Sequence, residues 1–412
     1  MIIIHAMDGR ILPRLVAAAL ADRLRVMPAV VVTGPRQAGK STLARYLTPG
    51  PRQYRTLDDL EVLAAAREDP QALVGGPAPV TLDEVQRAPE LLHAIKRAID
   101  DERVAGRFLL TGSANLLMMR QVSESLAGRA SYLTLWPMTR REQLGEGRGG
   151  LWEELLSAPH ETWTEVLDSG PGPADWRAHV KRGGFPTPAV ELKRTADRTI
   201  WFDGYVRTYL ERDLQELSSI SSLPDFARLM RVACLRLGQI VNQTALGREV
   251  ALPQATVHRW LNLLETSYML VRLPAYSLNR TKRLIKSPKI YWGDTGVALH
   301  LAGSAEPGGA HLENLVLNDL LAWRDARVER AEVFYWRTVN GEEVDFVIEA
   351  NGRLLPIEVK STSRPRLGDA MKLRTFRKEY SDVARSGLLL HTGEHTDWIA
   401  PDVLAVPWWR VI

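Results

Sequence analysis

A buried strand that runs straight into a glycine-rich loop and a helix constrains the fold more than any other feature. Ala29–Thr33 is apolar up to its last residue, and the next nine residues read Gly-Pro-Arg-Gln-Ala-Gly-Lys-Ser-Thr. They match G-x-x-x-x-G-K-[ST] at every fixed position. The backbone N–H groups of such a loop can wrap phosphate oxygens, and the helix after it points its positive dipole end at them. This segment therefore predicts a phosphate-binding parallel α/β sheet.

The loop assigns roles to individual residues. Lys40 is expected to meet the β- and γ-phosphates of a nucleoside triphosphate, and Ser41 to coordinate Mg²⁺. The alternative is a glycine-rich turn without a ligand. The residues expected to hold the nucleotide are Gly34, Pro35, Arg36, Gln37, Ala38, Gly39, Lys40, Ser41 and Thr42.

Acids follow a second apolar strand, in Val80-Thr-Leu-Asp83-Glu84. Asp83 would hold the Mg²⁺ through water or Ser41, and Glu84 would orient and activate the attacking water, unless the pair is only a solvated helix start. After Phe108–Thr111, Ser113 or Asn115 could sense the γ-phosphate. Arg129 could stabilise transition-state charge in cis or on a neighbouring subunit, or it could be an ordinary surface arginine.

The order of patterns along the chain predicts four domains. Short apolar runs alternate with helical patterns over residues 1–150, which predicts a parallel sheet. A helical linker or lid is expected over 151–235, a winged helix-turn-helix over 236–302, and a final α/β domain over 303–412. The apolar runs of the first domain are 29–33, 52–57, 79–82, 107–110 and 131–135.

Composition bounds the partners and the compartment. The 412 residues carry 53 basic and 49 acidic side chains, a net charge of +4, which permits a polyanionic partner without demanding one. The single cysteine, Cys234, lies in an apolar run and excludes an intrachain disulfide, which favours a reducing cytosol. An uninterrupted apolar run of about 18 residues is missing, so a cytoplasmic protein without membrane insertion is expected.

The middle of the chain contains a candidate DNA-binding element. Gln243–Leu273 holds two short helical patterns separated by Ala251-Leu-Pro-Gln, the order of a winged helix-turn-helix. A basic stretch follows and would contact phosphates, although winged helices also serve as packing or protein-interaction modules. The second helix should expose Gln254, Thr256, His258 and Arg259. The basic stretch comprises Arg272, Arg280, Lys282, Arg283, Lys286 and Lys289.

A hairpin near the C-terminus brings acids together. Asn351-Gly352 predicts a two-residue type I′ turn between two strands, and counting outward places Asp345 opposite Glu358 and Val344 opposite Val359. One face would then be apolar and the other acidic, apart from Lys360. Opposed carboxylates repel unless a cation or a shared proton lies between them. Pro356 cannot donate to the ladder and could shift this register.

Glu313, on the core-facing stripe of a preceding helix, would join that cluster. Glu313, Asp345 and Glu358-Val-Lys360 resemble the PD-(D/E)XK nuclease core. That resemblance implies Mg²⁺ held by Asp345 and Glu358, with Glu313 and Lys360 completing the catalytic set. The alternative to a metal site is a solvent-exposed face of the hairpin with a Glu343–Lys360 ion pair. A run of basic residues follows, suited to backbone contacts: Arg364, Arg366, Lys372, Arg374, Arg377 and Lys378.

Taken together, the motifs resemble AAA-type ATPases of a bacterial and archaeal group that carries a C-terminal domain of unknown function. The resemblance rests on the phosphate loop and on Leu82–Gln86, Ser125–Arg129, Arg182–Pro186 and Tyr209–Asp213. It implies an AAA-type P-loop domain, a helical and winged-helix middle and a restriction-endonuclease-like α/β domain. ATP is implied rather than GTP, because no guanine-reading N-K-x-D element occurs, and assembly of identical subunits is permitted.

Two functions fit these features. In the first, an ATPase couples its nucleotide cycle to DNA binding and to Mg²⁺-dependent cleavage. In the second, a non-cleaving, ATP-dependent switch recognises DNA or a protein partner through its C-terminal half. A small-molecule kinase shares the phosphate loop but explains neither the winged helix nor the hairpin.

Overall fold

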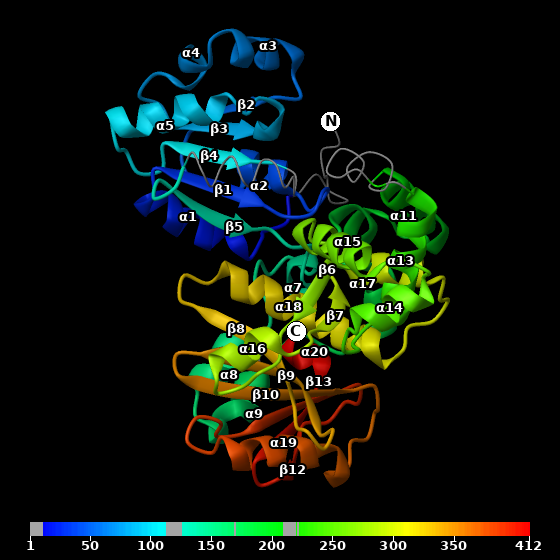
Figure 1. Ribbon diagram of the computed structural model, residues 1–412. Helices are drawn as coiled ribbons and strands as arrows, with labels where there is room; N and C mark the ends of the chain where they lie inside the picture. The colour runs from blue at the N-terminus through cyan, green and yellow to red at the C-terminus, as the bar shows by residue number, and fades with distance from the viewer. Residues whose placement is uncertain (1–10, 113–125, 169, 209–219, 221) are drawn as a thin grey trace.

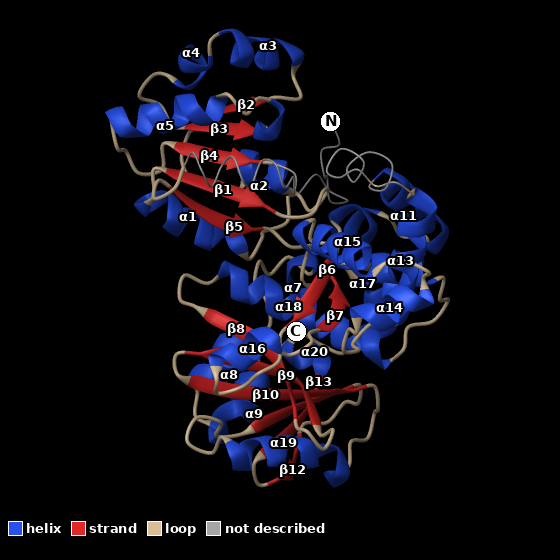
Figure 2. Ribbon diagram, viewed as in Figure 1, coloured by secondary structure: helices blue, strands red, loops and turns tan. Residues whose placement is uncertain are grey.

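The structure is a computed structural model, and it describes residues 11–112, 126–168, 170–208, 220 and 222–412 (Figure 1). Two separate sheets dominate it, with a mostly helical segment beside and between them (Figure 2). The chain is therefore a mixed α/β protein. None of the described helices combines the length and the apolar character that crossing a bilayer requires.

The N-terminal sheet is five-stranded and parallel, in the order β2-β3-β4-β1-β5. The predicted strands are confirmed to within a residue or two at each end. Their bounds are β1 Ala29–Thr33, β2 Gln53–Thr56, β3 Val80–Asp83, β4 Phe108–Thr111 and β5 Ala130–Thr134. The helices are α1 Val16–Val26, α2 Lys40–Tyr46, α3 Leu60–Glu68, α4 Pro70–Val74 and α5 Leu91–Asp101, with a short 3-10 turn at Val85–Arg87.

Alternation along β1 explains how both faces of this sheet are covered. Val30 and Val32 pack with α1 and α2, whereas Ala29 and Val31 pack with α3, α4 and α5. Every residue of β1 is buried, as expected for a central parallel strand with helices on both faces. The carboxyl end of β1 therefore opens into the loop that precedes α2.

The middle segment is mostly helical, as predicted. Its last part runs from α13 through α14 and α15 into the antiparallel strands β6 and β7, with the helix-turn-helix at α14 and α15. Its helices are α7 Arg140–Gln143, α8 Trp152–Ser157, α9 Trp163–Asp168, α10 Trp176–Arg182, α11 Thr195–Thr208, α13 Leu223–Leu235, α14 Gln243–Glu249, α15 Gln254–Thr266, α16 Arg280–Ile285 and α17 Thr295–Ala302. The strands are β6 Leu270–Leu273 and β7 Lys289–Trp292, and single helical turns lie at His160–Thr162 and Thr187–Glu191.

The C-terminal sheet is six-stranded and mixed, in the order β12-β13-β11-β10-β9-β8. Strands β10, β11 and β13 run parallel, and the others are antiparallel to their neighbours. The elements are α18 Gly309–Ala326, β8 Ala331–Arg337, β9 Glu343–Ala350, β10 Arg353–Lys360, α19 Leu367–Glu379, β11 Gly387–His391, β12 Asp397–Ala400, β13 Val403–Pro407 and α20 Trp408–Val411.

The predicted hairpin is confirmed near its turn and altered beyond it. Asn351 and Gly352 have φ of 51° and 73°, as a type I′ turn requires, and Phe346 pairs with Ile357 as predicted. The recorded β9–β10 pairing stops there, and the Asp345 carboxylate instead accepts a hydrogen bond from the Val359 N–H at 2.9 Å. The predicted Asp345–Glu358 pairing thus lies one step past the end of the ladder.

A β-bulge accounts for the change. The register between β8 and β9 shifts so that Asp345 and Phe346 together face Tyr335 alone, because the Tyr335 backbone bonds to Pro274 and Tyr276 of the middle segment. As a result Val344 packs with Val347 under α19 rather than with Phe346. The predicted side of Val344 is therefore wrong, as is its pairing with Val359.

One apolar core joins the middle segment to the C-terminal sheet. It includes Trp152 of α8, Trp260 of α15, Leu317 of α18, Phe346 of β9 and Trp408 of α20. The predicted core position of Cys234 is confirmed there. Since helices assigned by sequence to three different domains share this core, the domain boundaries at 150, 235 and 302 stay predictions.

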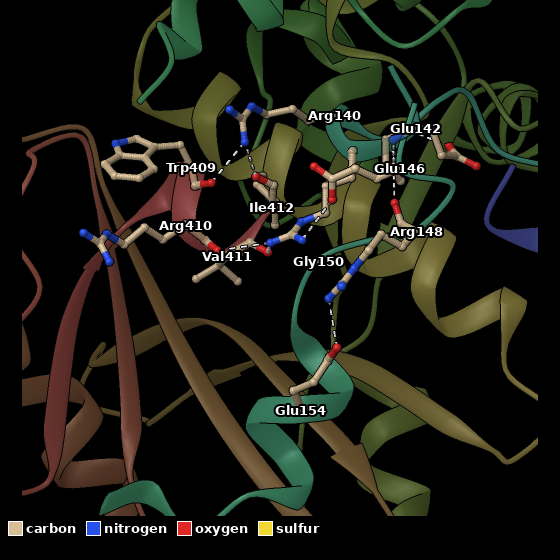
Figure 3. A network of polar contacts seen from close by, with 12 residues as sticks. Arg140, Glu142, Glu146, Arg148, Gly150, Glu154, Trp409, Arg410, Val411 and Ile412 are labelled. Atoms are coloured by element: carbon tan, nitrogen blue, oxygen red, sulfur yellow. Dashed lines mark hydrogen bonds and ion pairs between the residues drawn. The ribbon is translucent and has the colours of Figure 1, made fainter. Parts of the chain in front are cut away.

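Arginines that follow the N-terminal sheet form hydrogen bonds to the last turn of the chain (Figure 3). Arg140 donates to the carbonyl oxygens of Trp409 and Ile412, at 3.0 and 2.9 Å, and its other nitrogen donates to Gly172 O at 2.9 Å. Arg141 donates to Arg410 O and Val411 O at 3.2 and 3.4 Å. The segment after β5 is thereby bound to the end of the C-terminal domain.

Candidate functional site

The phosphate loop has the backbone that its glycines predict. Gly34 has φ 137°, and a Cβ there would lie 2.2 Å from Leu135 O, so only glycine lets β1 leave the sheet beside β5. Gly39, with φ 99°, starts α2. The buried Lys40 ammonium donates to Gly34 O at 3.1 Å and Pro35 O at 2.8 Å, inside the curve of the loop.

Asp83 lies at the carboxyl end of β3, facing the start of α2. Its Oδ1 accepts from Ser41 Oγ at 3.2 Å and from Thr111 Oγ1, and its Oδ2 accepts from Tyr54 Oη at 2.6 Å. Burial and the Asp83 charge raise the pKa of Tyr54 far above its ordinary value, so the phenol keeps its proton and donates. The predicted Ser41–Asp83 pair is therefore brought together.

Sequence reasoning missed Tyr54 and Thr111. Tyr54 lies in β2, beside Thr81 of β3, and Thr111 ends β4, the strand on the other side of β3. Their role depends on the order of strands, because β2 and β4 flank β3 and side chains from both can reach Asp83. These two hydroxyls fix the carboxylate that the motif alone identified.

Glu84 and Arg129 lie in different places relative to the loop. Glu84 follows β3 with φ 58°, and its carboxylate accepts from Gln86 Nε2. Arg129 lies directly before β5, at the amino ends of the strands, whereas the loop lies at their carboxyl ends. Its carbonyl oxygen accepts from Ala29 N, and its side chain donates to Asp100 Oδ1. The five residues of β1 separate it from the loop by roughly 16 Å. This distance disfavours a role in cis, and both the role on a neighbouring subunit and the ordinary surface arginine stay predictions.

Two further predicted elements lie outside the described residues. They are the sensor candidates Ser113 and Asn115, and the motif Tyr209–Asp213. The motif Arg182–Pro186 is described, and it serves as a joint: Gly184 O accepts from Met138 N at 2.6 Å, and Gly184 N donates to Asp294 Oδ2 at 2.6 Å. A Cβ on Gly183 would lie 2.6 Å from Asp294 Oδ1, so this close contact needs glycine.

Side chains from outside the sheet reach the loop and the strand before it. Tyr268, which follows α15, donates its hydroxyl to Thr33 Oγ1 at 2.8 Å and lies edge-on to Trp136, whose indole N–H donates to Asp325 Oδ2 at 2.7 Å. Arg14 donates to Ala38 O in the loop at 2.7 Å. The middle segment thus contacts the residue directly before Gly34.

An apolar recess lies beside α2. The recess opens to solvent, and Arg14 and Gly39 also contribute to its wall. The apolar lining comes from four separate segments of the chain: Ile11, Leu12, Leu43, Leu47, Met138, Pro186 and Val190.

The helix-turn-helix presents part of its second helix to solvent. Gln254, His258 and Arg259 are exposed, as predicted, and Thr256 is half-buried. His258 contacts Gln243 of α14 at 3.2 Å, which ties the two helices together. The exposed face is small and carries one arginine.

The predicted basic stretch is wrong as a solvent-facing strip. Arg283 is buried, bonds Glu349 at 3.1 Å through Nη2 and stacks on Tyr276 and Phe334. Arg272 bonds Glu265 and Asn262. Lys289 is 2% exposed. Each charge is paired with groups that lie far along the chain or on the neighbouring helix, which sequence alone does not reveal. Arg280 and Lys286 are exposed, and the Lys282 side chain lies outside what the structure describes.

The predicted acid cluster forms, with partners that were not predicted. Glu358 is fully buried, its Oε1 meets Lys360 Nζ at 2.5 Å and Lys372 Nζ at 3.6 Å, and its Oε2 has no hydrogen-bond partner among the described residues. Glu313 accepts from Tyr291 Oη at 3.1 Å. The Glu343–Lys360 pair of the solvent-exposed alternative is not formed, since Glu343 binds Lys289 at 2.5 Å.

Mutual repulsion and burial perturb these acids. Burial, and then the Asp345 charge, raises the pKa of Glu313 to about 8 and that of Glu358 to about 7. Burial lowers the pKa of Lys289, but Asp345, Glu313 and Glu343 raise it more, so its net pKa is raised. Glu313, Asp345, Glu358, Lys360 and Lys289 therefore form one electrostatic cluster.

The two predicted Mg²⁺ sites differ in how well their residues fit an ion. At the phosphate loop, a hydroxyl and a carboxylate face each other, the oxygen donors that Mg²⁺ prefers. At the C-terminal cluster, ammonium groups already contact the acids. No set of three or more histidine, cysteine, aspartate or glutamate side chains in the described part of the chain is arranged to hold a metal ion. The C-terminal residues, as arranged, do not fit one.

Family comparisons agree with the N-terminal architecture. Residues 27–144 match the model of the AAA domain family, so the N-terminal part of the chain is an AAA-type P-loop ATPase domain. Residues 173–307 and 308–411 match two families that are each described as a domain of unknown function, DUF8612 and DUF4143.

Relatives extend over nearly the whole chain. Uncharacterized proteins of Mycobacterium tuberculosis (strain ATCC 25618 / H37Rv) and Mycobacterium bovis (strain ATCC BAA-935 / AF2122/97) are each 30% identical over 400 residues, 95% of this chain and 82% of theirs. The chain belongs to the family of these mycobacterial proteins. An uncharacterized Haemophilus influenzae protein is 21% identical over 316 residues, 74% of this chain and 71% of its own.

Among solved structures, a Walker-type ATPase of Pyrococcus abyssi is similar with 15% identity and a TM-score of 0.43, over 73% of this chain and 99% of that one. A single-substitution variant of Thermotoga maritima RuvB is similar with 18% identity and a TM-score of 0.29, over 63% of this chain and 87% of that one.

Proposed function

We propose that this protein hydrolyses ATP and passes the state of its nucleotide to its C-terminal half, which acts as a non-cleaving switch on a partner. The observation that carries the proposal is the contact between Tyr268 and Thr33. Thr33 immediately precedes the phosphate loop, and Tyr268 links the helix-turn-helix to the strand β6. A change at the loop therefore has a short path to the middle segment.

The nucleotide end of the proposal assigns a task to each side chain. Lys40 would leave the carbonyls of Gly34 and Pro35 for the β- and γ-phosphates, and Ser41 and Asp83 would hold Mg²⁺, whose chemistry is to neutralise charge on the phosphates. Glu84 would orient the attacking water, with Gln86 holding its carboxylate in place. Arg129 would act only on the site of a neighbouring subunit.

The apolar recess beside α2 would take the adenine ring. It adjoins Gly39 and Thr42 of the loop, where the phosphates are expected, and its walls are mainly apolar. Met138 and Pro186 belong to the joint between the ATPase domain and the middle segment, so a bound base would touch both.

The partner surface proposed is the exposed start of α15, and its partner is DNA. Gln254 and Arg259 lie on the second helix of the helix-turn-helix, and Arg248 of α14 is also exposed. Because several basic residues of the predicted strip are buried or paired with acids, few cations remain for contact with phosphates. A weak, salt-sensitive interaction is therefore expected, and a protein partner is the alternative outcome.

Cleavage, the other function that the sequence predicts, is not proposed, because Lys289 and Lys372, which the nuclease resemblance does not include, also contact the C-terminal acids. If the protein nicked plasmid DNA in Mg²⁺ and Lys360→Ala abolished this nicking, a nuclease function would replace the proposed switch function. DNA-stimulated ATP turnover without nicking is expected.

Two measurements test the switch. Lys40→Ala should abolish ATP turnover, and turnover at the rate of the unaltered protein would exclude the phosphate loop as the site. Amide hydrogen exchange of α14, α15 and β6 should fall on adding ATP. Tyr268→Phe should abolish that fall while ATP still binds, and Tyr132→Phe, an exposed tyrosine on β5, should leave it unchanged. An undiminished ATP effect in Tyr268→Phe would show that the signal does not pass through this hydroxyl.

A further inference from the structure

The C-terminal acids are served by a lysine from a distant part of the chain. Lys289 is the first residue of β7, in the middle segment, and its ammonium lies 2.5 Å from Glu343 Oε1 and 3.7 Å from Asp345 Oδ1. Its side chain is 2% exposed. Tyr291, two residues further on, projects from the same face of β7 and donates to Glu313. One strand thus supplies a cation and a donor to three acids.

A buried ammonium in this position offsets the repulsion among the acids of the cluster. Three carboxylates in a shielded site need a positive charge nearby, and a divalent ion or a protein cation can provide it. Lys360 and Lys372 meet Glu358, and the ring of Tyr335 lies 5.7 Å from the Lys289 ammonium. Glu343 and Asp345 are met by Lys289, and Glu343 is also met by Arg337 at 3.3 Å.

The backbone of Lys289 holds it there. The residue pairs with Leu273 of β6 and forms a further antiparallel bridge with Ile240, so both sides of this strand end are bonded. The long side chain therefore starts from a fixed point. It enters the cluster while β7 stays docked against the C-terminal sheet.

We infer that Lys289 is a built-in cation of the C-terminal acid cluster and occupies the position beside Asp345 that a divalent metal ion would otherwise take. The cluster then binds no divalent ion while β7 is docked. This inference does not depend on ATP hydrolysis.

A Mn²⁺ titration of the nucleotide-free chain tests the inference. Bound Mn²⁺ is measured as the loss of the electron paramagnetic resonance signal of the free ion. Lys289→Met should create a Mn²⁺ site that the unaltered chain lacks, so that its affinity for Mn²⁺ at the cluster is at least about tenfold higher than that of the unaltered chain. Adding Asp345→Asn should remove the new site, while the Asn oxygen still accepts from Val359 N–H. Lys286→Met changes an exposed lysine three residues away and should create no site.

The unaltered chain provides a second readout that does not require a folded Lys289→Met variant. It and Asp345→Asn should bind the same number of Mn²⁺ ions. The inference is overturned if Asp345→Asn removes an ion from the otherwise unaltered chain, or if Lys289→Met folds and gains no Mn²⁺ site that Asp345→Asn removes.

Discussion

At the scale of single residues, Asp83 depends on hydroxyl groups that come from neighbouring strands. Tyr54→Phe removes the donor 2.6 Å from Asp83 Oδ2 and leaves the ring in place. Because groups behind a metal ligand fix its orientation, the Mg²⁺ concentration needed for half-maximal ATP turnover should rise about tenfold. Turnover measured against Mg²⁺ concentration checks this. Tyr46→Phe, an exposed tyrosine of α2, should behave as the parent protein. An unchanged Mg²⁺ dependence in Tyr54→Phe would contradict the role of this donor.

The perturbed acids predict a dependence of stability on pH. Because the pKa of Glu313 is raised from 4.5 to about 8, the folded chain binds a proton that the unfolded chain releases above about pH 4.5. The folded state therefore loses stability as pH rises toward 8. Glu313→Gln removes this penalty, and its oxygen still accepts from Tyr291. Its stability relative to the parent should rise by on the order of 1 to 2 kcal/mol between pH 5 and 8.

Urea unfolding at several pH values measures that difference. Glu306→Gln alters an exposed acid and should show a difference that barely changes with pH. A Glu313→Gln variant that loses stability relative to the parent as pH rises would mean that this carboxyl is ionised and favourably paired in the folded chain.

At the scale of elements, the β9–β10 hairpin depends on its turn. Gly352 has φ 73°, and a Cβ added there would have no neighbouring atom within 4 Å, so Gly352→Ala should cost only backbone strain, about 1 kcal/mol. Gly368→Ala is the matched control, since it also meets open space but lies in the first turn of α19. It should be neutral or slightly stabilising. Equal unfolding midpoints for the two variants would contradict the type I′ turn.

Sequence predicted what local patterns determine. The five parallel strands, the start of α2 and the hairpin turn all follow from short segments, and each was confirmed. The bulge at Asp345 could not be foreseen, because it arises where Tyr335 bonds to Pro274 and Tyr276, which lie in a distant part of the chain. The same holds for Lys289, whose sequence neighbours suggest a solvent-facing strip while its contacts are Glu343 and Asp345.

The candidate sites divide in the same way. The Ser41–Asp83 pair was predicted because parallel strands bring their carboxyl ends to one edge, whereas Tyr54 and Thr111 needed the strand order. At the C-terminal cluster the acids and Lys360 were predicted, whereas Lys289 and Lys372 were not. The sequence gives the sign of each charged side chain, but the fold determines which group it pairs with.

At the scale of the whole molecule, one apolar core runs through the middle segment and the C-terminal sheet, and the last residues of the chain complete it. Trp408, Trp409 and Val411 are buried in this core, and Leu151 N donates to Val411 O at 2.9 Å. The middle helices and the C-terminal sheet should therefore unfold together, while the N-terminal sheet, with its own cores, can unfold separately.

Arg140 tests how much its contacts to the last turn of the chain contribute. It donates to the carbonyl oxygens of Trp409 and Ile412 (Figure 3). It also donates to Gly172 O and stacks on Trp408. Arg140→Met fills similar space but leaves those carbonyls without their donor, so the unfolding free energy of the C-terminal unit should fall by about 3 kcal/mol. Arg148→Met, which removes only a half-exposed ion pair with Glu154, should cost less than about 1 kcal/mol. Tryptophan fluorescence during urea unfolding measures both. Equal losses would mean that the two arginines are equivalent surface groups and that the C-terminal turn is held by its apolar side chains alone.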